Sequence, residues 1–212
     1  MRRLLLGLAV TALTVLAFAG PAGAASGQVT HFKFSGAFAE AGLVTSFPGG
    51  SATTFINVSQ SNQASELDLA QFIFTQDANG NSTGQTIIST VAESGFSFTV
   101  DQGHLAGARL SASGLPVVTC TSDANGNVIG CSDTTIDLNV SLAGQGPISR
   151  GVSNQHFKTA GLSVTSHSNG TDRNAVAAGT IGGITYTATD QQFADFGISK
   201  GGTVTVCVGG SC

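Results

Sequence analysis

The residues best suited to chemistry gather in one segment of the sequence, between positions 150 and 174. This segment holds Arg150, His156, His167, Asp172 and Arg173. Histidine can act as a general base near neutral pH, and arginine can hold an anion or a developing oxyanion. If the fold brings these side chains together, they form a site for an anion or a small polar ligand. The interpretation we favour is simpler: they are solvated loop residues, with Arg173 paired to a nearby acid.

The pentapeptide DANGN occurs twice, in FTQDANGNSTG and in CTSDANGNVIGC. Each copy has oxygen-bearing side chains at alternate positions, a spacing that can wrap a calcium ion. These side chains are Asp77, Asn79 and Asn81 in the first copy and Asp123, Asn125 and Asn127 in the second. An EF-hand loop has glycine at its sixth position and glutamate at its twelfth, and neither copy fits. Asn-Gly is the preferred pair of a two-residue type I′ turn, so we favour two hairpin tips over calcium sites.

The four cysteines predict two disulfides, each across a hairpin. If Asn125-Gly126 is the tip of a two-residue turn, Cys120 falls directly opposite Cys131, within disulfide range. A five-residue loop centred on Asn125 would instead oppose Cys120 to Gly130, so the cysteine positions favour an even loop of two or four residues. The tail CVGGSC has the same even spacing about its two glycines and predicts a Cys207–Cys212 disulfide. Zinc is disfavoured because neither spacing resembles paired C-x2-C ligands.

Residues 1–24 have the three parts of a secretory signal peptide. MRR supplies positive charge, a long uncharged apolar run follows, and PAGA provides small residues for cleavage near Ala24. The mature chain, residues 25–212, has no second apolar run long enough to span a membrane. We therefore predict a single domain secreted to the extracellular, periplasmic or cell-wall space.

Composition narrows the possible partners of the mature chain. Loss of Arg2 and Arg3 with the leader leaves six basic and twelve acidic residues. A net charge of about −6 disfavours nucleic acid and anionic membranes, both of which require clustered cations. The chain has no Trp and one Tyr, which argues against a sugar-binding site. GISKG, around Ser199, resembles a nucleophile elbow, but an expected strand follows it and no His lies downstream.

Strict alternation of apolar and polar residues predicts an all-β fold with antiparallel strands. Residues 135–142, for example, place Ile136, Leu138, Val140 and Leu142 on one face. Glycine-rich breaks recur at the spacing of a β-sandwich or a barrel. We expect a single antiparallel β-sandwich, with a closed or partly closed β-barrel as the alternative. The phenylalanines, including Phe72 and Phe74, are interpreted mostly as inward-facing core residues.

These observations favour a secreted, non-catalytic binding or surface-associated module over an enzyme. Its partner would be a small molecule or an extracellular or cell-surface molecule, and no cofactor is expected. The alternative is a hydrolase-like extracellular enzyme that uses segment 150–174, with His156 or His167 as base and Arg173 as anion clamp. A third possibility is a structural protein that oligomerises through sheet edges.

Overall fold

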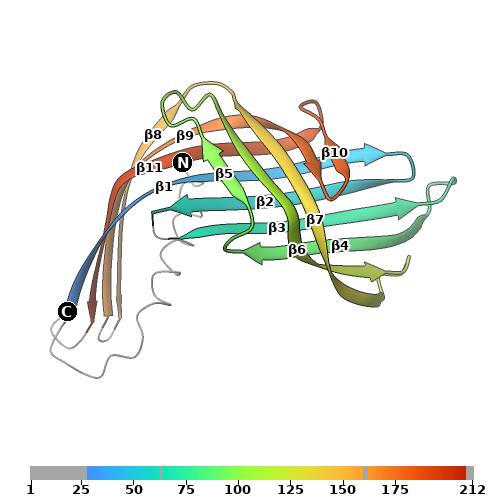
Figure 1. The fold of residues 1–212 in the computed structure, drawn as a ribbon, viewed down its shortest axis with the longest axis horizontal. Coiled ribbons are helices and arrows are strands. Elements are labelled where there is room, and N and C mark those ends of the chain that lie inside the picture. The colour runs from blue at the N-terminus through green and yellow to red at the C-terminus, as the bar shows by residue number, and fades with distance from the viewer. Residues whose placement is uncertain (1–27, 63, 160–161, 209–212) are drawn as a thin grey trace. The chain divides into compact units, whose positions relative to one another are not determined.

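The computed structural model describes residues 28–62, 64–159 and 162–208, and most of them lie in β-strands (Figure 1). The first six strands are β1 (Gln28–Phe47), β2 (Gly50–Ser61), β3 (Ser65–Gln76), β4 (Ser82–Ala92), β5 (Ser97–Val100) and β6 (Gly107–Ser122). The other five are β7 (Val128–Gly144), β8 (Ser149–Thr159), β9 (Leu162–Ile181), β10 (Ile184–Tyr186) and β11 (Gln191–Val208). None of the described residues lies in a helix with the length and hydropathy of a membrane span. The predicted leader, residues 1–24, lies outside the described residues.

The strands alternate buried and exposed side chains, as the sequence predicts. In β7, Ile136, Leu138 and Val140 are buried, whereas Asp137 and Asn139 between them are exposed. Successive side chains of a strand point to opposite faces of the sheet, so this pattern gives one dry face and one wet face. The prediction of an all-β, antiparallel protein is confirmed.

All eleven strands belong to one antiparallel sheet with the order β10-β9-β11-β1-β2-β3-β4-β6-β5. In addition, β8 pairs with β9, and β7 pairs with both β6 and β9. The double pairing of β7 links distant parts of the sheet and forms a partial ring of strands. This corrects the expected sandwich, which would have two packed sheets. Alternation has the same form in both architectures; closure depends on β7 meeting β9, a long-range pairing that leaves no local signal.

The chain forms two compact units. One, here called the ring unit, comprises Phe34–Gly151 and Asn169–Lys200 and contains the partial ring. The other, here called the smaller unit, includes residues 28–33, Val152–Ser168 and 201–208 among those described. Long strands β1, β9 and β11 contribute residues to both units.

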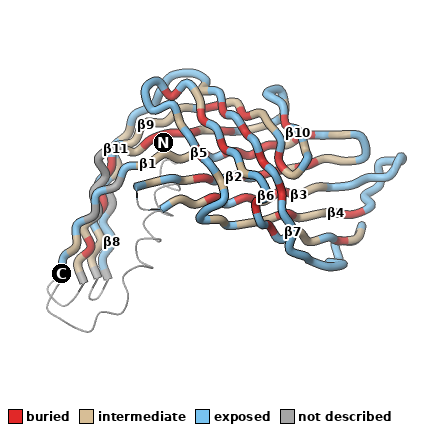
Figure 2. Tube along the Cα trace, in the orientation of Figure 1, coloured by how far each residue is buried: buried red, intermediate tan, exposed pale blue. Residues whose placement is uncertain are grey.

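The inward face of the ring unit forms the hydrophobic core. Figure 2 shows buried positions alternating with exposed ones along its strands. Leu43, Leu67, Leu69, Leu110 and Leu138 are among the fully buried side chains of this core. Burial of such a leucine stabilises the fold by about 1.5–3 kcal/mol.

A polar cluster lies within this core. Gln71 and Thr54 are fully buried, and they meet the buried hydroxyl of Tyr186. The Thr54 Oγ1 and Tyr186 Oη atoms are 2.6 Å apart, and Gln71 Nε2 donates to Tyr186 Oη at 3.2 Å. Gln71 Nε2 also donates to the carbonyl of Ile181 at 3.1 Å. These bonds fasten β10 and the end of β9 to β2 and β3. They offset part of the cost of burying the amide, whose Oε1 atom is buried without a hydrogen-bond partner.

The two DANGN segments form hairpin tips with the same local geometry. In the first tip, the Asp77 N–H donates to the Asn81 carbonyl at 2.9 Å, and the Gly80 N–H donates to the Asp77 carbonyl at 3.0 Å. The two equivalent bonds of the second tip are both 3.0 Å. The glycine of each tip has a φ of +83°, and the asparagine before it does not have a positive φ. These are three-residue loops with a left-handed glycine, so the predicted two-residue type I′ turn is wrong.

A one-residue bulge follows each three-residue loop. In the second hairpin, Ser122 pairs with Val128 whereas Thr121 pairs with Gly130, so Ile129 is the extra residue. The three-residue loop shifts the register by one residue relative to a two-residue turn, and the bulge shifts it back by one residue. Beyond the bulge, the strands therefore pair as they would after a two-residue turn.

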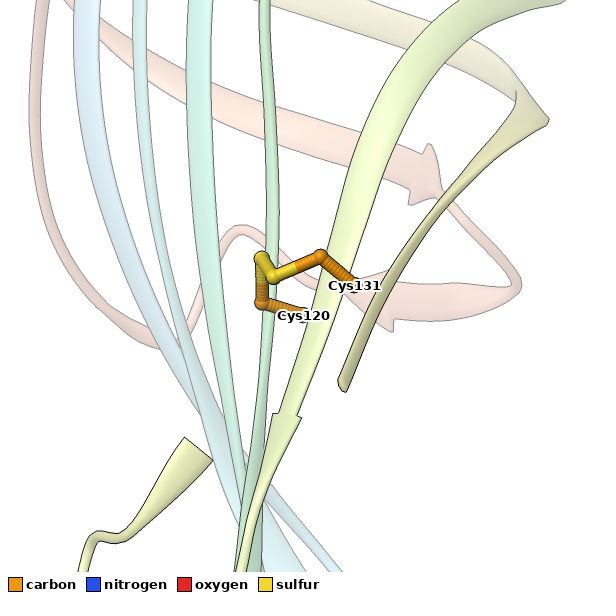
Figure 3. The surroundings of a disulfide bond; sticks show 2 residues. All are labelled: Cys120 and Cys131. Atoms are coloured by element: carbon orange, nitrogen blue, oxygen red, sulfur yellow. A yellow bond between two sulfur atoms is a disulfide. The ribbon is translucent and has the colours of Figure 1, made fainter. Parts of the chain in front are cut away.

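The bulge explains why the predicted Cys120–Cys131 disulfide is formed although the predicted turn type is wrong. Cys120 and Cys131 are direct partners of β6 and β7, with Cα atoms 4.0 Å apart, and a disulfide joins them (Figure 3). The Cys120–Cys131 prediction is therefore confirmed. It is the one disulfide that the described residues contain in full, because Cys212 of the predicted Cys207–Cys212 pair lies outside them.

Candidate functional site

The five residues predicted to form a site are divided between the two units. His156 and His167 belong to the smaller unit, whereas Arg150, Asp172 and Arg173 belong to the ring unit. Neighbours within the same unit hold the two histidines and Arg173.

The two histidines are paired with neutral polar groups across β8 and β9. The Nδ1 atom of His156 is 2.9 Å from the Thr165 hydroxyl, with which it shares a hydrogen bond. The Nδ1 atom of His167 donates to Oδ1 of Asn154. All four side chains are exposed. A catalytic histidine is commonly oriented by a carboxylate, and these neutral partners instead join neighbouring strands.

Arg173 connects two loops of the ring unit. Its Nε donates to the Gly146 carbonyl at 3.0 Å, and its Nη1 donates to the Leu105 carbonyl at 3.1 Å. Leu105 has a φ of 48°, and within the described residues no other non-glycine residue has a positive φ. Arg173 therefore stabilises a strained loop through backbone carbonyls. The acceptors of these two hydrogen bonds are backbone carbonyls rather than the predicted acidic side chain.

Asp172 is the only one of the five predicted site residues with a carboxyl group, and this group has an unusual environment. Its Oδ1 atom is buried without a hydrogen-bond partner, and burial raises the pKa of the carboxyl. Arg150 is exposed. A carboxyl with a raised pKa can hold a proton nearer neutral pH, which is a property of general acids.

Two shallow hollows lie on the ring unit. One has a volume of about 380 Å³ and is lined in part by Asp101 and Arg109; the other has about 550 Å³ and is lined in part by Asp137. Neither is lined by any of the five predicted site residues. The Asp137 carboxylate already accepts a hydrogen bond from the Gly114 N–H at 2.8 Å.

The aspartates of the DANGN tips organise their own loops. Asp77 Oδ1 accepts from the N–H groups of Asn79 at 2.8 Å and Asn81 at 2.9 Å, and Oδ2 accepts from Asn81 Nδ2 at 3.0 Å. The Asn81 and Asn127 side chains contribute most to lowering the pKa of Asp77 and Asp123 respectively. Among the described residues, no three or more His, Cys, Asp or Glu side chains are grouped as metal ligands. The oxygens proposed for calcium thus have a structural use.

The outward face of the ring unit carries an apolar surface that the sequence analysis missed. Along one row of the sheet, Phe55 of β2 lies between Gly42 of β1 and Ala70 of β3. Along the next row, Phe72 of β3 pairs with Ile87 of β4. We define the outer apolar band as Val44, Phe55, Phe72, Phe74, Ile87, Val118 and Phe193.

Four side chains of this band are well exposed. The exposed fractions are 46% for Phe55, 39% for Phe74, 43% for Val118 and 47% for Phe193. The Phe55 and Phe72 rings pack edge to face, with centroids 6.4 Å apart and planes at 77°. Such pairs are favourable beyond the area that they bury, so the aromatic surface is partly ordered in advance.

Glycine positions the remaining aromatic ring. A Cβ atom on Gly42 would lie 2.1 Å from the Phe193 ring, so the ring covers the bare backbone of β1. The ring places an aromatic side chain of β11 beside Phe55 of β2, because Gly42 and Phe55 are direct partners. Any larger residue at position 42 would displace this ring.

Phe72 and Phe74 face outward because of the residues around them. Leu67, Leu69 and Gln71 point inward and set the phase of β3. The polar Gln71 masked this phase in the sequence, and its partners Ile181 and Tyr186 are more than 100 residues away. The assignment of Phe72 and Phe74 to the core is therefore corrected.

The margins of the outer apolar band are acidic. Glu40 pairs with Asn57, which in turn pairs with Asp68, in the row next to Phe55. On the β7 side, Asp133 pairs with Val118. Strands β2, β3 and β4 contain no Lys, Arg or His. The formal charges of Glu40, Asp68 and Asp133 at these margins are negative, which favours a cationic partner.

Comparison of the chain with protein-family models, curated proteins and solved structures finds no match.

Proposed function

We propose that the chain is a secreted, non-catalytic binding module. Its outer apolar band would bind a protein or peptide segment that has apolar side chains flanked by Lys or Arg. The observation that carries this proposal is the run of exposed, ordered aromatic side chains on the outward face of the ring unit. Secretion is inferred from the sequence of residues 1–24.

The apolar part of the proposal follows from the rarity of such surfaces. Contiguous apolar patches on soluble proteins commonly mark interaction sites, and aromatic residues provide much of the binding energy at interfaces. Phe55, Phe74 and Phe193 each retain a large exposed area to bury against a partner. The sheet beneath them is hydrogen-bonded along β1, β2, β3 and β4, so little conformational freedom of the backbone would be lost on binding.

The charged part of the proposal follows from the acidic margins. Glu40, Asp68 and Asp133 would attract Lys or Arg side chains that flank an apolar segment. A second copy of this chain would instead bring acid toward acid. Anionic phospholipid would meet the same repulsion.

The direct test is binding of a synthetic peptide of alternating Leu and Lys, followed by isothermal titration calorimetry. A Leu/Glu peptide has the same apolar spacing with opposite charge, and a Ser/Lys peptide has the charge without the apolar side chains. We expect the Leu/Lys peptide to bind more tightly than either control. Its affinity should weaken with added salt, because screening reduces the electrostatic contribution.

Two variants localise the binding surface. Phe55→Thr removes an aromatic ring from the band and keeps a β-branched residue suited to a strand. Ile129→Thr is the matched control, because Ile129 is 73% exposed but lies at the second hairpin tip, outside the band. We expect Phe55→Thr to weaken binding at least tenfold, the equivalent of about 1.4 kcal/mol, and Ile129→Thr to leave it unchanged.

Three outcomes would contradict the proposal. The first is equal binding of the Leu/Lys and Leu/Glu peptides. The second is equal loss of binding in both variants. The third is self-association that Phe55→Thr abolishes in sedimentation experiments, since a second copy would then be the occupant of the band.

In the alternative proposal, an extracellular hydrolase, Asp172 would be the general acid. Its buried Oδ1 atom and raised pKa are compatible with a general acid. Hydrolysis of a panel of chromogenic esters and glycosides by the intact chain, and its loss in Asp172→Asn, would favour the enzyme. Activity that Asp172→Asn leaves unchanged would remove this residue from consideration.

A further inference from the structure

The sequence contains three Asn-Gly pairs: Asn79-Gly80, Asn125-Gly126 and Asn169-Gly170. We propose that Asn79 is a site of spontaneous deamidation, and that the Cys120–Cys131 disulfide protects Asn125 from the same reaction. The proposal is independent of the binding function. It rests on the shared DANGN sequence and geometry of the two hairpin tips and on the disulfide that joins the strands of the second hairpin.

The reaction needs only the chain and water. The backbone nitrogen of Gly80 attacks Cγ of Asn79, the Cγ–Nδ2 bond breaks, and ammonia leaves with the proton that the Gly80 nitrogen carried. The succinimide ring that results takes up one water molecule and opens at either carbonyl. The products are an aspartyl residue and an isoaspartyl residue. Glycine permits this attack best because it has no side chain to hinder ring closure.

In the closed tip, the attacking nitrogen is already engaged. The Gly80 N–H donates to the Asp77 carbonyl at 3.0 Å, and the Asn79 N–H donates to Asp77 Oδ1 at 2.8 Å. Ring closure therefore requires the tip to open first. The reaction rate then follows the fraction of time that the tip spends open.

The second tip is a matched internal control. The Gly126 N–H also donates to the Asp123 carbonyl at 3.0 Å, and the Asn125 N–H donates to Asp123 Oδ1 at 2.9 Å. The pentapeptide is the same, both asparagines are exposed, and both glycines have a φ of +83°. The chemistry and the closed geometry therefore do not distinguish Asn79 from Asn125.

The disulfide does distinguish them. Cys120 and Cys131 join the two strands just beyond the second tip, which limits how far that tip can open. At the corresponding positions of the first hairpin, Phe74 and Gln85 are also direct partners, but they have no covalent link. Only hydrogen bonds, including those of the Thr75 hydroxyl to Gly84 and Thr83, hold this end of β3 and β4 together. Because hydrogen bonds open reversibly and a disulfide does not, we expect the Gly80 nitrogen to be released more often than that of Gly126.

The third pair lies in a different environment. Asn169-Gly170 is inside β9, whose pairing holds the backbone extended, and Gly170 does not have a positive φ. This pair is not at a hairpin tip. We therefore place its reaction rate below that of Asn79.

Deamidation would change the first hairpin in two ways. Either product replaces a neutral amide by a carboxylate two residues from Asp77. The isoaspartyl product also lengthens the main chain by one carbon, so a three-residue loop with its bonds to the Asp77 carbonyl and Asn81 carbonyl no longer fits. The end of the β3–β4 hairpin would then open permanently.

The test is incubation of the folded, disulfide-bonded chain at mildly alkaline pH, with peptide mapping by mass spectrometry over time. We expect Asn79 to deamidate several-fold faster than Asn125 and Asn169. The urea-unfolded, reduced chain is the control for intrinsic chemistry, and there Asn79 and Asn125 should react at equal rates.

Two variants move the disulfide constraint. Cys120→Ser with Cys131→Ser should raise the rate at Asn125 to that at Asn79. Phe74→Cys with Gln85→Cys should form a disulfide across the first hairpin and lower the rate at Asn79 to that at Asn125. The comparison within the unmodified chain stands even if one variant fails to fold. Equal rates at Asn79 and Asn125 in the folded chain, or a faster rate at Asn125 or Asn169, would overturn the proposal.

Discussion

The two DANGN hairpins have the same tip and different constraints. Each tip has a three-residue loop that ends in a left-handed glycine, and a bulged residue lies three positions after that glycine. The β6–β7 hairpin carries the Cys120–Cys131 disulfide, whereas the β3–β4 hairpin has the non-covalent pair Phe74 and Gln85 at the same positions. Because the geometry is shared, the disulfide is not needed to form the tip. Its effect is to limit opening.

The disulfide also belongs to the surface that we propose as the binding site. Ile87 of the outer apolar band pairs with Cys120, which pairs with Cys131. Phe74, at the equivalent position of the first hairpin, is itself part of the band. The same pair of positions thus contributes a constraint in one hairpin and an exposed aromatic ring in the other.

Removal of the disulfide should give the largest change in stability. Cys120→Ser with Cys131→Ser should lower the free energy of unfolding by about 3 kcal/mol, because the unfolded chain gains freedom. Urea unfolding followed by the fluorescence of Tyr186 measures this, since Tyr186 is buried and is the only Tyr in a chain without Trp. No loss of stability would mean that the unfolded chain is not constrained by this disulfide.

The glycine that follows each bulge should show the next largest effect, and only in one hairpin. A Cβ on Gly84 would lie 2.8 Å from the Ser122 carbonyl oxygen, whereas a Cβ on Gly130 would meet nothing within 4 Å. We expect Gly84→Ala to lower the free energy of unfolding by about 1–3 kcal/mol and Gly130→Ala to change it by less than about 0.5 kcal/mol. Equal effects in urea unfolding would contradict the placement of β4 beside β6.

The tip glycines should have smaller and equal effects. Gly80 and Gly126 share a φ of +83°, and a Cβ on either would meet nothing within 4 Å. The cost of Gly80→Ala or Gly126→Ala is therefore that of the left-handed backbone alone, about 1 kcal/mol in each case. Thermal unfolding of the two variants measures this, and unequal shifts would show that the tips differ in backbone geometry.

The tip aspartates should give the smallest effect, a dependence on acid pH. Hydrogen bonds, chiefly from the Asn81 and Asn127 side chains, lower the pKa of Asp77 and Asp123 below the ordinary value of about 3.9. The folded state thus favours the ionised form; the stabilisation is present above that value and is lost as pH falls through the folded-state pKa. Melting temperature should fall below about pH 4, and Asp77→Asn with Asp123→Asn should flatten part of this decline. An unchanged acid profile in this variant would contradict the assigned role.

The sequence predicted the fold class and one disulfide because both depend on local patterns. Alternation along β7 places Ile136, Leu138 and Val140 on one face whatever the topology. The spacing of Cys120 and Cys131 was sufficient to pair them, although the turn was assigned wrongly. An odd loop and a bulge at Ile129 produce the same register as an even loop.

What the sequence did not predict depends on contacts between distant residues. The ring is completed when β7 meets β9, and Gln71 is buried because Ile181 and Tyr186 supply its hydrogen bonds. Without these partners, a glutamine suggests an exposed position, which placed Phe72 and Phe74 on the wrong face. Arg173 was likewise expected to meet an acid, and its actual partners are backbone carbonyls.

The most direct test of the account is hydrogen exchange at the two tip glycines. The amides of Gly80 and Gly126 follow the same residue, so their intrinsic exchange rates are equal, and both donate to an aspartate carbonyl at 3.0 Å. We predict that Gly80 exchanges several-fold faster in the disulfide-bonded protein and that reduction of Cys120–Cys131 removes the difference. Equal exchange in the disulfide-bonded protein would contradict the claim that the disulfide controls opening of the tip.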